Sequence, residues 1–199
     1  MPNNEVNEAK NKPLTKPKTK SATGAPQRPK TKQKKMLETQ IKDKILSWKA
    51  ISERRKKWKL EGKKIVFTNG CFDILHYGHL HYLAAAKDLG DILIVAANSQ
   101  ASISRLKGPN RPIQDELTRY HLLASLMYVD VVTVFAEDTP YELIKAIRPD
   151  VLVKGGDWTP EQIVGSDIVL ADGGEVKSLP FVEGYSTTSI EKKILSQKD

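Results

Sequence analysis

The sequence has 199 residues, which is enough for one domain of ordinary size and a tail. Apolar residues make up 39% of it, and its net charge of +8 is unevenly spread: residues 1–35 hold ten of the 32 basic residues but two of the 24 acidic ones, so the rest of the chain is neutral. This neutrality argues against a nucleic-acid-binding body, and the single cysteine, Cys71, excludes an intramolecular disulfide.

The first 35 residues are rich in Lys, Pro, Thr and Asn and have almost no large apolar side chains. Such a segment cannot bury enough surface to offset its chain entropy, so we predict a disordered basic tail over residues 1–35. An electrostatic tether to RNA, DNA or acidic lipid is the functional alternative. The N-terminus has no apolar stretch of the secretory type, and the longest aliphatic run, residues 92–97, is too short to cross a bilayer. We therefore expect a cytoplasmic protein without a membrane partner.

The folded domain is predicted to span residues 36–199 and to open with one helix. Between residues 36 and 61, apolar side chains such as Ile41, Ile45 and Trp48 recur at three- and four-residue steps among charged residues. This spacing predicts a single leading helix over the whole segment.

Beyond the leading helix, segments typical of strands alternate with segments typical of helices. The predicted strands cover residues 64–68, 91–97, 129–135, 151–153 and 175–179, and the predicted helices cover residues 78–89, 114–127, 140–147 and 187–195. Regular alternation of this kind predicts an α/β fold, a Rossmann-like parallel sheet with helices on both faces.

The strongest functional signal follows the first predicted strand, because parallel sheets bind ligands beyond the carboxyl ends of their strands. The strand runs into Asn69-Gly70-Cys71-Phe72-Asp73, and His76-Tyr77-Gly78-His79 then opens a helix. The free N–H groups and the dipole of a helix start attract an anion. Two imidazoles three residues apart point the same way there, so we predict a phosphate site with two histidine donors. A zinc pair is the weaker alternative, since no cysteine or acidic metal motif accompanies the histidines.

This segment resembles the signature of the nucleotidyltransferase superfamily, in which a strand end with Gly-x-Phe-Asp leads into His-x-Gly-His. Within the superfamily, Thr-Asn-Gly-Cys-Phe-Asp is similar to the D-glycero-β-D-manno-heptose 1-phosphate adenylyltransferases. The similarity covers about residues 42–196 and includes, in order, Asn98-Ser99, Arg105-Leu106-Lys107-Gly108, Arg111-Pro112, Glu137-Asp138-Thr139-Pro140, Lys154-Gly155-Gly156-Asp157 and Ser186-Thr187-Thr188.

One departure from the cytidylyltransferase relatives bears on the nucleotide. In those relatives Arg-Thr-x-Gly-Ile leads into Ser-Thr-Thr, whereas residues 181–185 here are Phe-Val-Glu-Gly-Tyr. The difference favours ATP over CTP.

The resemblance implies a role for each candidate site residue. His76 and His79 are the expected catalytic pair, donating hydrogen bonds to phosphate oxygens as charge builds in the transition state. Nucleotide contacts are expected for Asn69, Gly70, Cys71, Phe72, Gly78, Ser186, Thr187 and Thr188. Substrate contacts are expected for Asp73, Asn98, Lys107, Arg119 and Lys154.

Several of these residues also have an ordinary structural interpretation. Ser186 is a good helix N-cap, Asp73 could cap a turn, and Lys107 precedes a Gly- and Pro-rich loop that could simply be solvated. Arg119 could be a surface residue of its helix. Cys71 fits a small buried residue better than a nucleophile.

The expected reaction transfers AMP from ATP to D-glycero-β-D-manno-heptose 1-phosphate and yields ADP-heptose and pyrophosphate, with Mg²⁺ accompanying ATP. Many members of the family carry an N-terminal sugar-kinase domain, and the roughly 60 residues before the motif are too few for one. We therefore expect a separate sugar kinase as a pathway partner, and a homo-oligomer. The alternatives are glycerol-3-phosphate cytidylyltransferase, a coenzyme adenylyltransferase, a nucleic-acid-binding module that uses the tail, and an inactive homologue, against which the intact histidines argue.

Overall fold

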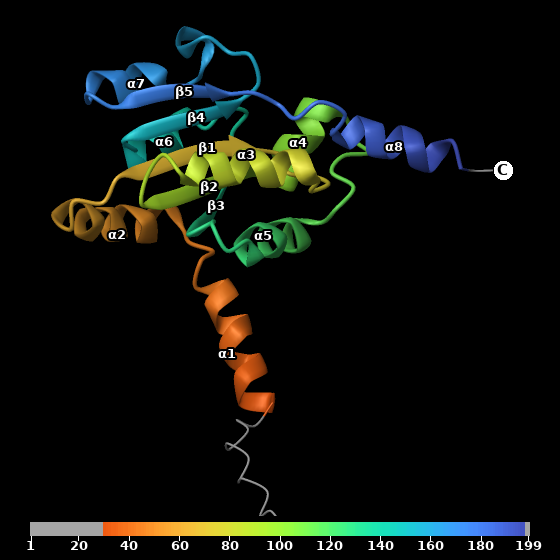
Figure 1. The fold of residues 1–199 in the computed structure, drawn as a ribbon, viewed down its shortest axis with the longest axis horizontal. Coiled ribbons are helices and arrows are strands. Elements are labelled where there is room, and N and C mark those ends of the chain that lie inside the picture. The colour runs from red at the N-terminus through yellow and green to blue at the C-terminus, as the bar shows by residue number, and fades with distance from the viewer. Residues whose placement is uncertain (1–29, 198–199) are drawn as a thin grey trace, which may run out of the picture.

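A five-stranded parallel sheet lies at the centre of the protein, with strand order β3-β2-β1-β4-β5 (Figure 1). The computed structural model describes residues 30–197, and side chains from residue 36 onward. The strands are β1 (Ile65–Gly70), β2 (Ile92–Asn98), β3 (Val131–Phe135), β4 (Val151–Gly155) and β5 (Glu175–Leu179). The predicted α/β fold with a parallel sheet is confirmed.

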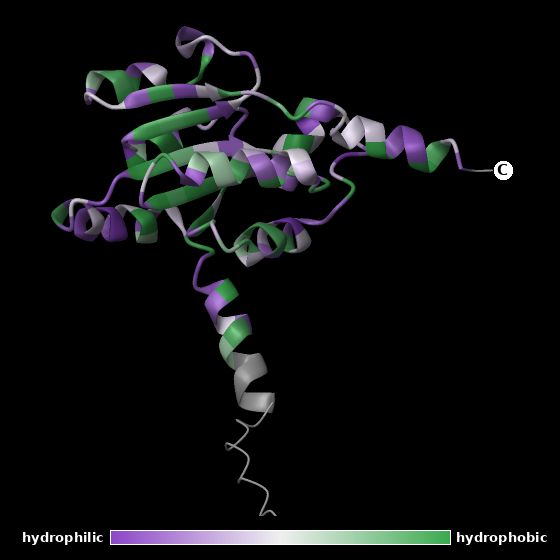
Figure 2. Cartoon of the chain, viewed as in Figure 1, coloured by the Kyte–Doolittle hydropathy of each residue, from purple (hydrophilic) through white to green (hydrophobic). Residues whose placement is uncertain are grey.

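Helices cover both faces of the sheet, because the side chains of each buried strand alternate between two cores. Val66 and Val95 face one core, which α3 (Tyr77–Lys87) and α5 (Glu116–Ser125) close. Phe67 and Ile94 face the other. That second core is closed by α2 (Trp48–Leu60), α6 (Tyr141–Ile147) and α7 (Ser166–Ala171). Figure 2 shows the inner strands largely in the green of hydrophobic residues, as burial on both faces requires.

The chain order creates a crevice between β1 and β4. From β1 the chain builds outward through β2 to β3, and it then returns to the other side of β1 to build β4 and β5. Connections that leave two neighbouring strands in opposite directions open a gap at their carboxyl ends, which is where such sheets bind ligands. The predicted phosphate-binding turn follows β1 and therefore lies at this gap.

The predicted single leading helix is wrong: the segment forms two helices, α1 (Lys30–Lys42) and α2, with a break between them. In the break, Leu46 donates its N–H to the Val132 carbonyl at 2.9 Å, and Val132 donates to the Lys44 carbonyl at 2.8 Å. The edge strand β3 has unpaired backbone groups, and these residues satisfy some of them, which overrides the helical periodicity. Ser47 then caps α2 by accepting from the Ala50 N–H.

The tail prediction falls mostly outside the described residues, since residues 1–29 are not among them. Residues 30–35, assigned to the disordered tail from the sequence, instead form the first part of α1, which extends away from the sheet in Figure 1. Three short elements had no counterpart in the prediction: α4 (Gln100–Lys107), the 3₁₀ turn η1 (Pro160–Gln162) and α7. The last helix, α8 (Thr187–Leu195), has the predicted bounds. Among the described residues, no helix has the length and apolar character needed to cross a membrane.

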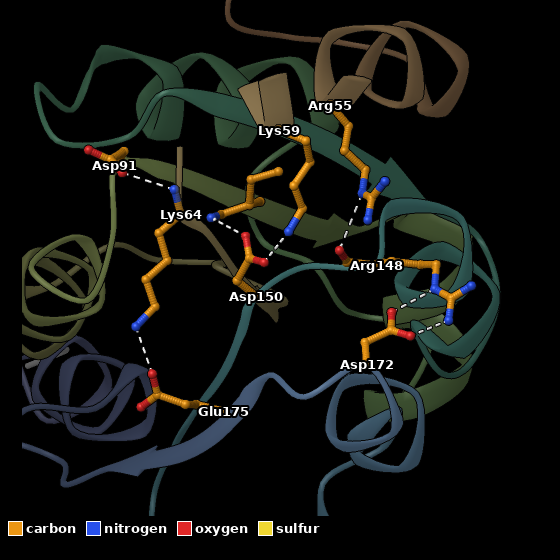
Figure 3. A network of polar contacts seen from close by, with 9 residues as sticks. Arg55, Lys59, Lys64, Asp91, Arg148, Asp150, Asp172 and Glu175 are labelled. Atoms are coloured by element: carbon orange, nitrogen blue, oxygen red, sulfur yellow. Dashed lines mark hydrogen bonds and ion pairs between the residues drawn. The ribbon is translucent and has the colours of Figure 1, made fainter. Parts of the chain in front are cut away.

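At the amino ends of the strands, opposite the gap between β1 and β4, charged side chains connect α2 to the starts of the strands (Figure 3). Asp150 accepts from the Ile65 N–H at 2.8 Å and forms an ion pair with Lys59. Lys64 pairs with Glu175 at 2.6 Å. These contacts satisfy backbone and side-chain groups where β1, β4 and β5 begin.

Replacing Asp150 with Ala should lower the free energy of unfolding by about 1–2 kcal/mol, because the Ile65 N–H and the Lys59 ammonium both lose an acceptor. Urea unfolding measures the change. Glu142→Ala is the matched control: its carboxylate pairs with Lys145 at 3.8 Å on the surface, and its loss should cost less than about 0.5 kcal/mol. Equal stabilities of the two variants would contradict this role of Asp150.

Candidate active site at the carboxyl ends of β1 and β4

Two adjoining pockets open at the gap between β1 and β4. The larger has a volume of about 540 Å³ and the smaller about 380 Å³, and both are lined by Asn69, Gly70 and Lys154. A hollow of about 710 Å³ at the opposite edge is larger still, but most of its charged side chains, such as Arg148 and Asp172, already pair with one another. The two strand-end pockets are therefore the candidate site.

The turn after β1 is tightly built. A side-chain Cβ at Gly70 would lie 3.1 Å from the ring of Phe72, so glycine allows the ring to fold back over the strand end. Phe72 itself has a φ of 45°, in the left-handed region that L-residues rarely adopt. Gly70 and Phe72 both line the larger pocket, as the nucleotide-binding prediction requires.

The two histidines lie together at the start of α3, as their spacing predicts. His76 is the N-cap residue, His79 is in the first turn, and their ring centroids are 3.9 Å apart. Both line the larger pocket. The Nδ1 atom of each ring is buried and has no partner among the described residues, so hydrogen bonding to a ligand falls to Nε2. A Cβ at Gly78 would lie 3.1 Å from His76 Nδ1, which explains the small residue between them.

The surroundings keep this pair uncharged. Burial lowers the pKa of His79 to about 4, and the neighbouring His76 and Lys107 act in the same direction. Burial also lowers the pKa of His76. Since both pKa values are lowered, neither ring is an imidazolium cation near neutral pH, and each offers the single N–H of a neutral imidazole as a donor.

The start of α8 faces the same pocket. The Ser186 hydroxyl caps the helix by accepting from the Ser189 N–H at 3.0 Å. In turn, the Ser186 N–H donates to the Ser189 hydroxyl at 3.2 Å. Ser186 and Thr187 line the larger pocket, whereas Thr188 lines neither. The site thus brings together two helix starts, α3 and α8, each with free N–H groups suited to phosphate.

Lys154 is the cation at the boundary of the two pockets. It lies at the end of β4 and lines both pockets, and its ammonium has no hydrogen bond or ion pair with the side chains of residues 36–197 or the backbone of residues 30–197. Burial lowers its pKa, an effect that Cys71 opposes. Lys107 lines neither pocket, although its positive charge contributes to the lowered pKa of His79.

Asp73, a predicted substrate contact, lines neither pocket. Its side chain is 2% exposed, and its carboxylate accepts from Arg111 Nη1 at 2.7 Å and from the N–H groups of Ile113 and Gln114 at 2.8 and 3.1 Å. With its oxygens occupied by the loop that precedes α5, Asp73 positions that loop.

Arg119 was expected to bind phosphate, but it is fully buried and lines neither pocket. Its Nη1 donates to the carbonyl of Cys71 at 2.8 Å and to that of Asn98 at 2.9 Å. The guanidinium therefore connects the end of β2 to the turn after β1. A charged side chain on an amphipathic helix can face solvent or a ligand, or it can face inward where strand-end carbonyls need a donor. The sequence alone does not tell which of these applies to Arg119.

The smaller pocket contains residues that the sequence did not single out. Cys71 and Asn98 line it as predicted candidates, although Asn98 is nearly buried and donates to Ser102 Oγ at 3.0 Å. Its other walls are formed by Leu106, Asp138, Thr139, Pro140, Trp158, Gln162, Ile163 and Val164. Trp158 lies three residues after the end of β4, just beyond Gly155-Gly156-Asp157, and an aromatic residue there was the signal that could have identified it.

The larger pocket also has unpredicted walls, chiefly aromatic. Phe181 and Tyr185 come from the segment before α8, and Tyr82 comes from α3. The Tyr185 ring lies 5.1 Å from that of Tyr77. Phe181 occupies the segment in which cytidylyltransferase relatives have arginine. The sequence difference from those relatives therefore lies in the wall of the larger pocket.

A family model described as cytidylyltransferase-like matches residues 67–193. The chain belongs to this family. Its membership makes it a nucleotidyltransferase, as the His-x-Gly-His signature predicted. The matched residues contain the last four residues of β1, all of β2 to β5 and both helix starts of the site.

Curated relatives match the same region at higher identity. The bifunctional protein HldE of Trichlorobacter lovleyi is 53% identical over 154 residues, which cover 77% of this chain and 31% of that protein. The bifunctional protein HldE of a Marinomonas species is 58% identical over 149 residues, 75% of this chain and 31% of that protein. The chain thus spans about a third of the length of these relatives.

Two solved structures share the fold. The lipopolysaccharide core biosynthesis protein of Thermoplasma volcanium has a TM-score of 0.51 and 31% identity, with 63% of this chain and 100% of that chain covered. The pantoate-beta-alanine ligase of Francisella tularensis has a TM-score of 0.51 at 18% identity, over 78% of this chain and 80% of that chain, a likeness of fold alone.

The lowered pKa of His79 predicts a pH effect on stability. The folded protein keeps His79 neutral to about pH 4, whereas the unfolded chain protonates it near 6.5. Its contribution is therefore fully present above pH 6.5 and is lost as the pH falls through 4. His79→Gln should lose less stability than the wild type between pH 7 and pH 4.5, measured by urea unfolding. His121→Gln, outside both pockets, is the control. An NMR titration of His79 with a midpoint near 6.5 would refute the prediction.

Proposed function

We propose that the protein transfers AMP from ATP to D-glycero-β-D-manno-heptose 1-phosphate, forming ADP-heptose and pyrophosphate. The observation that carries the proposal is the adjacent pair of histidines, His76 and His79, which lines one pocket together with the start of α8. The identity of acceptor and nucleotide rests on the motif resemblance. The high identity to proteins named HldE and the similarity to a lipopolysaccharide core biosynthesis protein support it.

ATP fits the larger pocket. Its aromatic walls, Phe181, Tyr185 and Tyr82, suit a purine, since such rings bury large apolar area and stack on a base. The triphosphate would lie between the starts of α3 and α8, where backbone N–H groups, His76 and His79 can donate. A volume of about 540 Å³ is in the range of nucleotide-sized sites.

The acceptor fits the smaller pocket. Trp158 offers an aromatic face for the sugar ring, while Asp138 and Gln162 offer polar groups for its hydroxyls. Lys154, at the boundary of the two pockets and free of partners among the described residues, would hold the acceptor phosphate against the α-phosphate of ATP. In this placement Asn98 and Cys71, both predicted to contact a ligand, would lie in the wall of the acceptor pocket.

The chemistry is an in-line displacement at the α-phosphorus. An oxygen of the sugar phosphate forms a bond to the α-phosphorus, and the bond to the bridging oxygen of the β-phosphate breaks, so pyrophosphate leaves with the electron pair. The attacking oxygen is already anionic at neutral pH and needs no general base. Catalysis then comes from positioning and from donors aimed at the developing charge, the role of His76, His79 and Lys154.

Mg²⁺ would enter with ATP. Within residues 30–197, no group of three or more His, Cys, Asp or Glu is placed to hold a metal. The protein groups thus do not form a cage for the ion, and phosphate and water oxygens would supply its ligands.

The remaining partners follow from the reaction. A kinase must install the acceptor phosphate. We propose that this is a separate sugar kinase and that both enzymes work in the cytoplasm, where ATP is available. We also propose a homo-oligomer, because Leu117, Leu122 and Met127 leave apolar side chains exposed on and after α5.

His76→Ala and His79→Ala should each lower turnover by ~10²–10³ while the fold is retained, because each removes a preorganised donor to the transition state. Pyrophosphate release measures turnover, and thermal unfolding checks the fold. His121→Ala on α5 is the control, since it lines neither pocket. Turnover near the wild-type value in both pocket variants would exclude the proposed mechanism.

The protein should prefer ATP strongly over CTP, because the pocket wall has Phe181 in the segment where cytidylyltransferase relatives have an arginine. The test follows pyrophosphate release with each nucleotide against a panel of sugar 1-phosphates and glycerol 3-phosphate. Release with ATP and the heptose phosphate is the expected result. Equal or faster release with CTP would instead favour a glycerol-3-phosphate cytidylyltransferase.

A further inference from the structure

The helix that completes the larger pocket is weakly attached to the body. No residue of α8 is buried, and Ile194 and Leu195 near its end are exposed. Figure 1 shows α8 extending beyond the end of the sheet. Its first residues, Ser186 and Thr187, nevertheless have to stay opposite the histidines of α3 for the pocket to exist. Side-chain contacts, rather than a buried face, must hold the helix in place.

One guanidinium supplies the main polar contact. Arg111 Nη2 forms an ion pair with Glu191 in the middle of α8, and Arg111 Nη1 pairs with Asp73 at 2.7 Å. The Arg111 and Glu191 side chains are 20% and 26% exposed. Arg111 is itself held in place, since Ser104 Oγ donates to its carbonyl at 2.6 Å. The planar guanidinium can serve two carboxylates at once, which an ammonium cannot do with the same geometry.

We propose that Arg111 and Glu191 are positioning residues that latch α8 onto the loop before α5 and so set the distance between the two phosphate-binding helix starts. The chain of contacts runs from Asp73, next to the signature turn, through Arg111 to Glu191. The proposal rests on the proposed function in one respect: the ligand between the helix starts is taken to be ATP.

A different arrangement is physically possible and gives opposite results. Arg111 could itself bind a substrate phosphate, with Glu191 occupying it until the substrate arrives. Neutralising Glu191 would then free the guanidinium and tighten binding. If Glu191 instead latches the helix, neutralising it loosens α8 and weakens binding. The buried carboxylate of Asp73 favours the latch, because it already fixes the direction of the guanidinium.

The test compares the full chain with Glu191→Gln, Arg111→Lys and the double variant. Glu142→Gln, whose exposed carboxylate lies on α6, is the matched control. Hydrogen exchange without any nucleotide reports on α8 directly. We expect Glu191→Gln to speed exchange of the α8 amides about tenfold and to leave α3 unchanged, because the partly exposed pair contributes less than a fully buried one.

Kinetics provide the second measurement. Glu191→Gln should raise KM for ATP about tenfold with kcat nearly unchanged, and the double variant should be little worse than Arg111→Lys alone, since both act through one contact. Unchanged α8 exchange, a lowered KM for ATP, or fully additive effects would each overturn the latch. If the wild type fails to use ATP, the proposed function fails, while hydrogen exchange still decides whether the latch exists.

Discussion

Parallel pairing of β1 with β2 on one side and with β4 on the other is the constraint on which the site depends. Because all five strands run the same way, every carboxyl end falls on one edge, and the reversal of chain direction beside β1 leaves a gap there. The signature turn and Lys154 belong to segments about 80 residues apart, yet both reach this gap. The position of the site therefore follows from strand order more than from any single motif residue.

Buried polar groups hold that edge in shape. Arg119 joins the end of β2 to the turn after β1 through two carbonyls, and Asp73 holds the loop before α5 through two backbone N–H groups. An unpaired charge would be costly in an apolar interior. Asp73 meets this cost through three donors, whereas Arg119 is bonded through Nη1 alone, and its Nε and Nη2 are buried without a hydrogen-bond partner among the described residues. Asp73 and Arg119, two predicted substrate contacts, thus bond to backbone groups and line neither pocket, whereas Lys154 lines both, and its ammonium has no ion pair or hydrogen bond in the part of the chain that is described.

The chemistry proposed here needs little from side chains beyond fixed donors. Both reacting groups are phosphates, so the nucleophile is already charged and the protein has only to align it and stabilise charge. Neutral histidines suit that task, since they donate without adding a cation whose strength would vary with pH, and burial keeps them neutral. The larger pocket has chiefly aromatic unpredicted walls, and the smaller one combines apolar walls with Asp138, Thr139 and Gln162, so the proposed nucleotide and sugar would meet different surroundings.

The sequence by itself determined the α/β class, all five strands, and the approach of His76 and His79, because these depend on local periodicity and on spacing within one helix turn. It did not reveal that the leading helix breaks so that residues 44–46 pair with β3, since edge-strand pairing is a long-range contact. It also did not show that Arg119 and Asp73 face inward or that Trp158 and Phe181 line pockets. Which way a side chain points, and whether its charge meets a carbonyl or a ligand, is decided only when distant segments pack together.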